Sequence, residues 1–165
     1  MIVSSDWKIR EIKASDNPSL AIVLRAVLLE MGVPKVGTAY ADPELDTMFE
    51  AYDVSRSAYF VVTYKEQVMG GAGIAPLVNE AATICELQKM YFSPKSRGLG
   101  LGKKMIQICL NFAKNNGFTQ CYLETMPNMK QAQRLYQQTG FHYIETPMGN
   151  TGHFSCPIWM IKPLN

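Results

Sequence analysis

The sequence predicts an α/β (α+β) fold, in which a mixed sheet of six to seven mostly antiparallel strands carries helices on both faces. Strand-like and helix-like segments alternate along 165 residues, a length that suits one domain with a sizeable core. Three consecutive strand-like segments separated by short turns predict an antiparallel meander. Farther along, one long helix connects two strands, and the right-handed crossover rule makes such strands parallel neighbours. We therefore expect a single domain over residues 1–165, in which the fourth and fifth strands run parallel.

The first third of the chain predicts one strand followed by two helices. Residues 7–12 alternate in polarity and form a short strand. Asn17 followed by Pro18 is typical of an N-cap with proline at the first helical position, and apolar residues then recur at helical spacing until Gly32. After a loop that contains proline and glycine, a second short helix is expected over residues 44–52.

The middle of the chain predicts the meander and the longest helix. Strands are expected over residues 58–64, 67–75 and 82–92, and glycines at positions 70, 71 and 73 indicate a bulge or a close backbone approach in the second of them. A helix follows over residues 100–116. Its periodicity predicts a buried face made of Leu101, Met105, Ile108, Cys109, Phe112 and Ala113.

The C-terminal part predicts three more strands and one helix. The strands are expected over residues 120–125, 141–144 and 157–161, and the helix over residues 130–139. The complete order is β-α-α-β-β-β-α-β-α-β-β, with no linker, repeat or low-complexity stretch.

Composition and charge exclude several classes of function. A net charge of +2 and the absence of a long basic run argue against a nucleic-acid-binding protein. No run of 18 apolar residues and no secretory leader are visible, so we expect a protein of the cytoplasm without a membrane anchor. Four cysteines lie far apart, without metal-ligand spacing, and are expected to be reduced, buried and free of metal (Cys85, Cys109, Cys121 and Cys156).

One glycine-rich stretch between the fourth strand and the longest helix predicts an anion site. It reads Ser96-Arg97-Gly98-Leu99-Gly100-Leu101-Gly102-Lys103-Lys104. The first turn of a helix has unpaired N–H donors and a partly positive end, and glycines leave those donors accessible to a phosphate. The alternative is a glycine-rich turn that only caps a helix.

The spacing of this stretch excludes two common phosphate loops. A Walker A loop requires glycine at position 97 and Ser or Thr at 104, where the chain has Arg97 and Lys104. The dinucleotide fingerprint requires glycine at position 103 or 105, where the chain has Lys103 and Met105. The pattern that fits is R-x-x-G-x-G, with Gly100 and Gly102 as its glycines.

That pattern resembles the pyrophosphate loop of the GNAT (Gcn5-related N-acetyltransferase) superfamily. The resemblance extends over about residues 7–161, because two more features occur at the right places. Residues 133–141, Gln-Arg-Leu-Tyr-Gln-Gln-Thr-Gly-Phe, are similar to the end of the family's fourth helix, and residues 85–92 are similar to its fourth strand.

The resemblance implies acetyl-CoA, or a close acyl-CoA, as the donor. In the family the fourth and fifth strands splay apart and the pantetheine arm lies between them on the backbone of the fourth strand, which corresponds here to Met90, Tyr91 and Phe92. The pyrophosphate would lie on the N–H groups of Arg97, Gly98, Leu99, Gly100, Leu101, Gly102 and Lys103. Many members carry an asparagine seven residues before the tyrosine of the fourth helix; here Met129 has that place, and Asn128, one residue earlier, is the candidate CoA ligand.

Acetylation of an amine requires a base for the ammonium proton and an acid for the departing thiolate. Glu86 is the candidate base, because it lies eleven residues before Arg97, the spacing of the glutamate in histone-type members. A carboxylate inside an apolar strand also has a raised pKa if it is buried. The alternative is a structural carboxylate paired with Lys89 or a neighbour, and Glu124 is the reserve base or a ligand of the substrate amine.

Tyr136 is the candidate acid. In the family pattern the hydroxyl of this tyrosine points at the thioester sulfur, and an ordinary phenol pKa of about 10 suits proton donation. The alternative is a helix tyrosine whose ring packs in the core.

The acceptor is predicted to be a primary amine of a small molecule or a peptide. In the family it enters beside the first two helices and the last two strands, where Tyr40, Glu124 and His153 are candidate contacts. Asp42 and Asp46 could attract a cationic amine, or they could only cap a helix. The resemblance also implies a homodimer formed by the C-terminal strands.

Two other functions compete with the enzyme. A CoA-binding sensor or partner-binding module would need no catalytic residues, whereas this chain has both the glutamate and the tyrosine. A general nucleotide-binding protein would need one of the two fingerprints that the spacing excludes.

Overall fold

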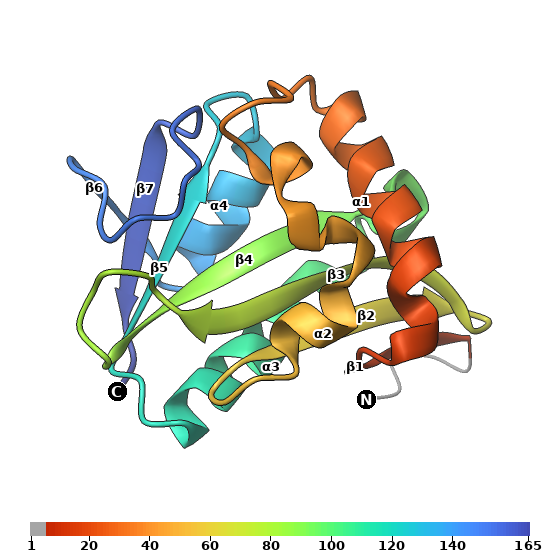
Figure 1. Cartoon of the computed structure of the whole chain (residues 1–165), viewed down its shortest axis with the longest axis horizontal. Helices are drawn as coiled ribbons and strands as arrows, with labels where there is room; N and C mark the ends of the chain where they lie inside the picture. Colours follow the sequence, from red (N-terminus) through yellow and green to blue (C-terminus); the bar gives the residue numbers. More distant parts are fainter. Residues whose placement is uncertain (1–5) are drawn as a thin grey trace.

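Seven strands form one sheet in the order β1-β2-β3-β4-β5-β7-β6 in the computed structural model, which describes residues 6–165 (Figure 1). The strands are β1 (Trp7–Glu11), β2 (Ala58–Tyr64), β3 (Gln67–Pro76), β4 (Ile84–Phe92), β5 (Gln120–Thr125), β6 (His142–Ile144) and β7 (Ile158–Pro163). The helices are α1 (Asn17–Glu30), α2 (Met48–Tyr52), α3 (Leu101–Asn115) and α4 (Lys130–Gln138). The predicted order of elements and the mixed sheet are therefore confirmed.

The sheet is antiparallel except where β4 meets β5. These two strands are parallel, and their pairing is short: Ile84, Cys85 and Glu86 lie opposite Gln120, Cys121 and Tyr122. Beyond Glu86, β4 continues alongside β3 while β5 continues alongside β7, and no further β4–β5 pair occurs among the described residues. The two strands therefore separate at Glu86, as the family resemblance implied.

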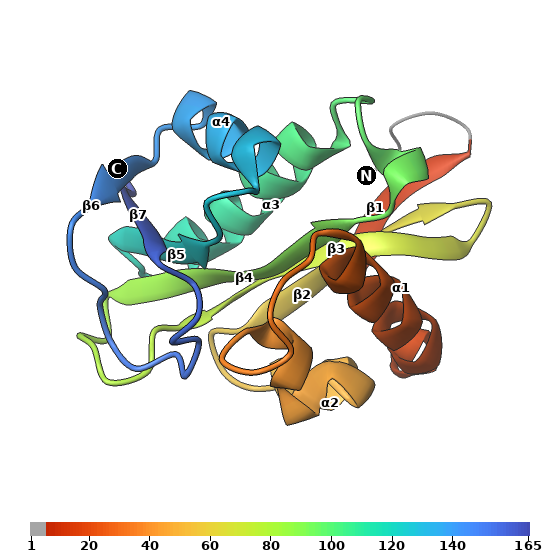
Figure 2. The ribbon, with the colours of Figure 1, turned by 90° about the horizontal axis from the view of Figure 1, so that it is seen from above.

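Helices cover both faces of the sheet. Figure 2 shows α1 and α2 on one face and α3 and α4 on the other. The core beneath α3 and α4 is the larger of the two and includes Leu101, Met105 and Cys109 from α3. The core beneath α1 and α2 includes Leu20, Leu24, Met48, Tyr52 and Tyr59.

The buried face of α3 differs in part from the prediction. Ile106 and Leu110 are buried, whereas Ile108 and Phe112, which were expected to be buried, are only half-buried and lie at the edge of the core. The periodicity of the sequence allowed a stripe on either side of Leu101, Met105 and Cys109, and packing of α3 against the sheet buries the side that carries Ile106 and Leu110.

The second helix begins later than predicted, and the reason is Asn17. Residues Pro43–Asp46 form a 3-10 turn, and α2 begins only at Met48. Asn17 is itself the first residue of α1 and does not cap it; its side chain accepts the Phe49 N–H at 2.8 Å and donates to Glu50 at 2.8 Å. Asn17 thus joins the beginnings of the two helices.

Bulges interrupt the meander where the glycines indicated. Met69 is an extra residue of β3 opposite β2, and β4 has an extra residue around Lys89 opposite β3. The bulge turns Lys89 into the left-handed region, with φ of +48°. At Gly71 an added Cβ would lie 2.5 Å from the Phe60 carbonyl oxygen, so this glycine permits the close approach of two strands.

The four cysteines are buried and make no disulfide within the described residues. The helices of the described region are all too short or too polar to cross a membrane. Residues 6–165 also contain no group of three His, Cys, Asp or Glu side chains arranged to hold a metal ion.

Candidate active site

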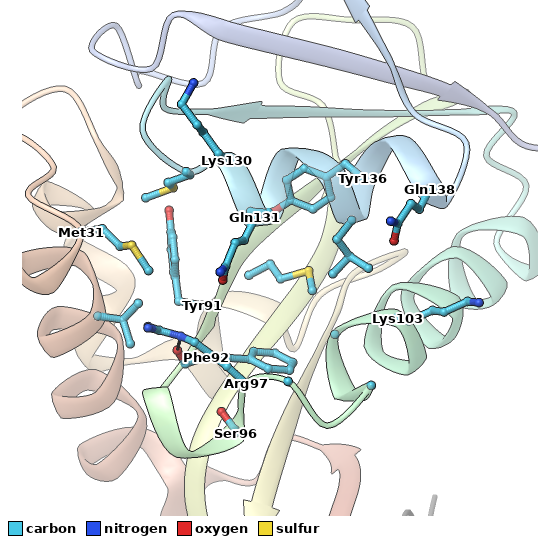
Figure 3. Close-up of a pocket in the computed structure, with 18 of the residues that line it drawn as sticks. Met31, Tyr91, Phe92, Ser96, Arg97, Lys103, Lys130, Gln131, Tyr136 and Gln138 are labelled. Atoms are coloured by element: carbon cyan, nitrogen blue, oxygen red, sulfur yellow. Dashed lines mark hydrogen bonds between the residues drawn. The ribbon is translucent and has the colours of Figure 1, made fainter.

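A cleft of about 660 Å³ lies where β4 and β5 separate. Figure 3 shows Met31 at the end of α1 on one side, Arg97 on the loop after β4, Lys103 on α3, and Gln131, Tyr136 and Gln138 on α4. Apolar side chains contribute most of the remaining lining, among them Val27, Met90, Phe92, Met129 and Leu135. The end of β4 that has lost β5 as a partner, Met90 to Phe92, forms one wall.

The glycine-rich stretch ends this cleft with a row of unpaired amides. The N–H groups of residues 98–103 meet no acceptor among the described residues, and the first backbone bond of α3 is that of Lys104 to the Gly100 carbonyl. Gly98 and Gly100 have φ of +74° and +76°, which only glycine adopts without strain. The glycine-rich stretch therefore presents a row of free N–H donors at the N-terminus of a 15-residue helix, and the anion that it binds stays a prediction.

Two residues of the stretch also contribute to the structure around the cleft. The Arg97 N–H donates to the Pro94 carbonyl, and its guanidinium makes two bonds with the Glu30 carboxylate at 2.8 and 2.9 Å and one with the Phe92 carbonyl. The side chain of Arg97 therefore anchors the loop to α1, and the free amides begin at Gly98. Gly102 packs closely against α4, since an added Cβ would lie 2.8 Å from the end of the Leu135 side chain, which would have to shift.

Glu86 occupies the last paired position of β4, at the apex of the split. It is 6% exposed, and one of its oxygens accepts a hydrogen bond from the Gln88 amide at 2.7 Å. Burial raises the pKa of Glu86 to about 7, with the charge of Glu124 adding to the increase and the Gln88 amide opposing it. The alternative partner, Lys89, does not pair with Glu86. A carboxyl in this state can both take and release a proton near neutral pH.

Tyr136 enters the cleft from α4, which lies with α3 on the face of the sheet opposite to α1 and α2. The residue is 7% exposed, its ring packs edge-on against Phe141 with the centroids 6.0 Å apart, and it also lines the cleft. Burial raises the pKa of Tyr136 well above its usual range, so the hydroxyl keeps its proton. No partner for this hydroxyl occurs among residues 6–165. The ring of Tyr136 therefore packs in the core, while its hydroxyl remains a free donor.

Lys89 is the centre of a buried ionic cluster on the α1/α2 face. Its ammonium lies 3.0 Å from a carboxylate oxygen of Asp42 and 3.2 Å from one of Glu44. Both carboxylate oxygens of Asp42 also lie 2.9 Å from Nε2 of His153. Burial alone would lower the pKa of His153, but the hydrogen bond to Asp42 and its charge outweigh burial and raise it.

Comparison with known proteins decides the family. A sequence profile of the acetyltransferase (GNAT) family matches residues 26–141. The chain belongs to this family.

Relatives and solved structures agree with that assignment. YjgM of Escherichia coli, an uncharacterized N-acetyltransferase, is 44% identical over 94% of this chain and 93% of its own. A GNAT-family acetyltransferase from Staphylococcus aureus superimposes with a TM-score of 0.85 at 21% identity, covering 96% and 99% of the two chains. The Salmonella typhimurium protein yncA, whose structure holds its cofactor acetyl-CoA, superimposes with a TM-score of 0.77 at 18% identity, covering 98% and 95%. The chain is thus an N-acetyltransferase with the GNAT fold.

In this GNAT enzyme the acidic residues near the site are already paired. Asp42 and Glu44 bind Lys89, Asp46 binds Arg25 at 2.6 Å, and Glu124 accepts hydrogen bonds from the hydroxyls of Tyr122 and Thr151. Asp42 and Asp46 therefore each pair with a cation of the chain itself, and neither caps α2, whose N-cap is Thr47; attraction of a cationic amine by these carboxylates stays a prediction. The bulge of β4 brings the Lys89 ammonium to both Asp42 and Glu44, and α1 brings Arg25 to Asp46.

Asn128 lies in the cleft lining, whereas Tyr40 does not. Asn128 lines the cleft, but its amide donates to the Met31 carbonyl at 2.7 Å and does not cap α4, whose N-cap is Met129. Tyr40 is half-buried beside Lys35 and lies outside the cleft lining. His153 reaches the buried cluster rather than the cleft.

Sequence reasoning missed Gln88, Tyr52 and Gln131. Gln88 lies two positions after Glu86, so the period of two along a strand places both side chains on one face, which was a usable signal. Tyr52 had only an apolar role in the second helix, although its hydroxyl bonds to Gln88 at 2.6 Å. Gln131 extends into the cleft from α4, and no motif in the sequence distinguished it (Figure 3).

Proposed function

We propose that this acetyltransferase transfers an acetyl group from acetyl-CoA to a primary amine of a small molecule or peptide, with Glu86 as general base and Tyr136 as general acid. One observation carries the proposal: the parallel strands separate at a buried glutamate, and the cleft at this split is lined by a buried tyrosine and a row of free amides, although Glu86 itself is not among the lining residues.

Two properties of the cleft and one related structure support a CoA-type donor. Free N–H groups at residues 98–103, next to the side chain of Lys103, suit a pyrophosphate. The unpaired edge of β4 at residues 90–92 offers backbone groups to an amide-rich arm, which can bond there like an added strand. The acetyl-CoA found in yncA supports the same donor for this chain.

Glu86 and Tyr136 would divide the proton transfers between them. The bound donor supplies an acetyl thioester, whose C–S bond breaks as a C–N bond to the amine forms. Glu86, with a pKa near 7, takes the proton that the ammonium group loses. Tyr136 keeps its proton in the buried cleft and gives it to the departing sulfur.

A CoA-binding module without catalysis is the second candidate. It would bind the donor through the same amides and the same strand edge, but it would have no need for a glutamate with a raised pKa. The buried carboxyl and the tyrosine in the cleft favour the enzyme.

A thiol-release assay with acetyl-CoA and a panel of amines tests the proposal. Wild type is compared with Glu86→Gln and Tyr136→Phe, two nearly isosteric changes. Turnover of one amine that falls about 10²-fold or more in both variants is expected for general acid and base residues. Binding of CoA without turnover on any amine favours the sensor module, and full activity of both variants excludes the assigned roles.

Three expectations about location, oligomeric state and domain organisation stay predictions. Location in the cytoplasm, a homodimer formed by the C-terminal strands, and a single domain over residues 1–165 are testable by fractionation, by size-exclusion chromatography with light scattering and by limited proteolysis.

A further inference from the structure

Two side chains outside the cleft form a hydrogen-bonded row that ends on Glu86. Gln88 Nε2 donates to Glu86 Oε1 at 2.7 Å, and the Tyr52 hydroxyl donates to Gln88 Oε1 at 2.6 Å. Glu86 and Gln88 are alternate residues of β4 and therefore share the face that α1 and α2 cover. Tyr52 is the last residue of α2, so the row connects a helix to the candidate base.

Tyr52 determines which way the Gln88 amide points. Burial raises the pKa of the Tyr52 phenol well above its usual range, and the charge of Glu86 adds to this, so the hydroxyl remains a donor. Oε1 of Gln88 must then face Tyr52, which leaves the NH₂ group for Glu86. The ring of Tyr52 is itself held, since it is 6% exposed and packs against Tyr59 with the centroids 5.2 Å apart.

The row leaves the two oxygens of Glu86 in different states. Oε1 is bound to Gln88, and among residues 6–165 no group is hydrogen-bonded to Oε2. A carboxylate whose one oxygen is held cannot rotate freely, so its second oxygen keeps a fixed direction.

We propose that Gln88 and Tyr52 are positioning residues of the acetyl transfer: they hold Oε1 of Glu86 and so direct Oε2 toward the proton of the acceptor amine. This inference rests on the proposed role of Glu86 as base. It gives a role in the reaction to two polar side chains whose burial in an apolar layer otherwise costs free energy.

Several titratable groups surround Glu86, and the Gln88 amide, which does not titrate, donates the hydrogen bond that lowers the pKa of Glu86. Glu124 raises the pKa of Glu86 from β5, whereas Lys89 from β4 and His153 from the loop before β7 lower it. The buried groups Tyr52, Tyr122, Cys121 and Cys156 also interact electrostatically with Glu86 and keep their protons, from α2, from β5 and from the same loop. Since the Gln88 amide stabilises the charged form of Glu86, its loss raises the pKa of the base.

The test is the pH profile of kcat/KM for the amine. Gln88→Leu removes the donor, and Gln88→Glu keeps the size of the side chain but replaces the NH₂ group with an oxygen. We expect the acid limb of the profile to move upward by about one pH unit in Gln88→Leu, and by more in Gln88→Glu, because a hydrogen bond to a charged group is lost. Tyr52→Phe should move the limb in the same direction by a smaller amount. The KM for acetyl-CoA should stay unchanged in all three.

Tyr143→Phe is the matched control. The Tyr143 hydroxyl donates to Gln133 Oε1 at 2.7 Å, the same kind of pair on the surface and far along the sheet from Glu86. Its loss should leave the limb in place. Tyr52→Phe also serves as the readout if the Gln88 variants fold poorly.

Three outcomes separate this inference from the role of Glu86 itself. If Glu86→Gln abolishes the acid limb while the Gln88 and Tyr52 variants only lower activity equally at every pH, the positioning role is wrong and the base remains. If Glu86→Gln keeps both its activity and the limb, the proposed base is wrong and the inference fails with it. If the limb moves in the Gln88 and Tyr52 variants but not in Tyr143→Phe, the positioning role is supported.

Discussion

Glu86→Gln should stabilise the protein at alkaline pH while it removes activity. A carboxyl that is 6% exposed, at the end of the parallel pair, is difficult to ionise, and its pKa rises from 4.5 to about 7. A folded-state pKa above the unfolded value means that ionisation favours unfolding. The carboxyl therefore has no destabilising effect below pH 4.5, and its effect grows as the pH increases through 7.

The size of the effect follows from the two pKa values. At about 1.36 kcal/mol for each pH unit, ionisation of Glu86 lowers the free energy of unfolding by about 1 kcal/mol at pH 5.5 and about 3 kcal/mol at pH 8.5. Glutamine keeps the shape of the side chain and an oxygen for the Gln88 amide, but it has no charge to bury. The substitution should thus add about 2 kcal/mol more stability at pH 8.5 than at pH 5.5.

Urea unfolding followed by tryptophan fluorescence measures this difference. Wild type and Glu86→Gln are compared at both pH values, with Glu145→Gln as the control because it makes the same change at an exposed residue. The control should alter stability little and equally at the two pH values. An equal gain for Glu86→Gln at pH 5.5 and 8.5, or a loss at pH 8.5, would refute the reasoning from burial.

Three further predictions concern the loop and the ionic cluster. Gly100→Ala should lower the free energy of unfolding by about 1–2 kcal/mol, because φ of +76° is strained for alanine although space is open there, and a urea midpoint measures it. Asp42→Asn should cost about 3 kcal/mol or more, since Lys89 stays buried with one carboxylate fewer, whereas Asp46→Asn should cost much less, because its ion pair with Arg25 is exposed to solvent. Asp42→Asn should also lower the pKa of His153, which an NMR titration of the imidazole measures; an unchanged pKa would contradict the contact.

The local pattern of the chain was sufficient for most of the fold. Strands at 58–64 and 120–125 were predicted residue for residue, because each has a continuous β-rich run bounded by turns. The beginning of α2 was predicted too early, since Pro43 begins a 3-10 turn and a distant residue, Asn17, provides the bond that helps α2 begin. Such a bond, 32 residues apart in sequence, leaves no trace in local periodicity.

The parts of the candidate site that depend on backbone position were predicted from the sequence. The parts that depend on ion-pair partners from other elements were not. Free amides at a glycine-rich helix N-terminus follow from the sequence, because glycine and the helix geometry suffice. The partners of Asp42, Asp46 and Arg97 did not follow, because oppositely charged residues from other elements reach them only in the folded chain.

The sequence by itself determined the order of strands and helices, the family, the glycine loop and the two residues proposed for proton transfer, since each of these depends on residue type and spacing along the chain. Tertiary structure alone decided the electrostatics. The fold buries Glu86 where β4 and β5 separate, and the bulge of β4 places Lys89 beside Asp42 and Glu44. It also connects Tyr52 through Gln88 to the Glu86 carboxyl by hydrogen bonds. The reason is physical: a pKa depends on burial and on neighbouring charges, and both come from residues distant in sequence.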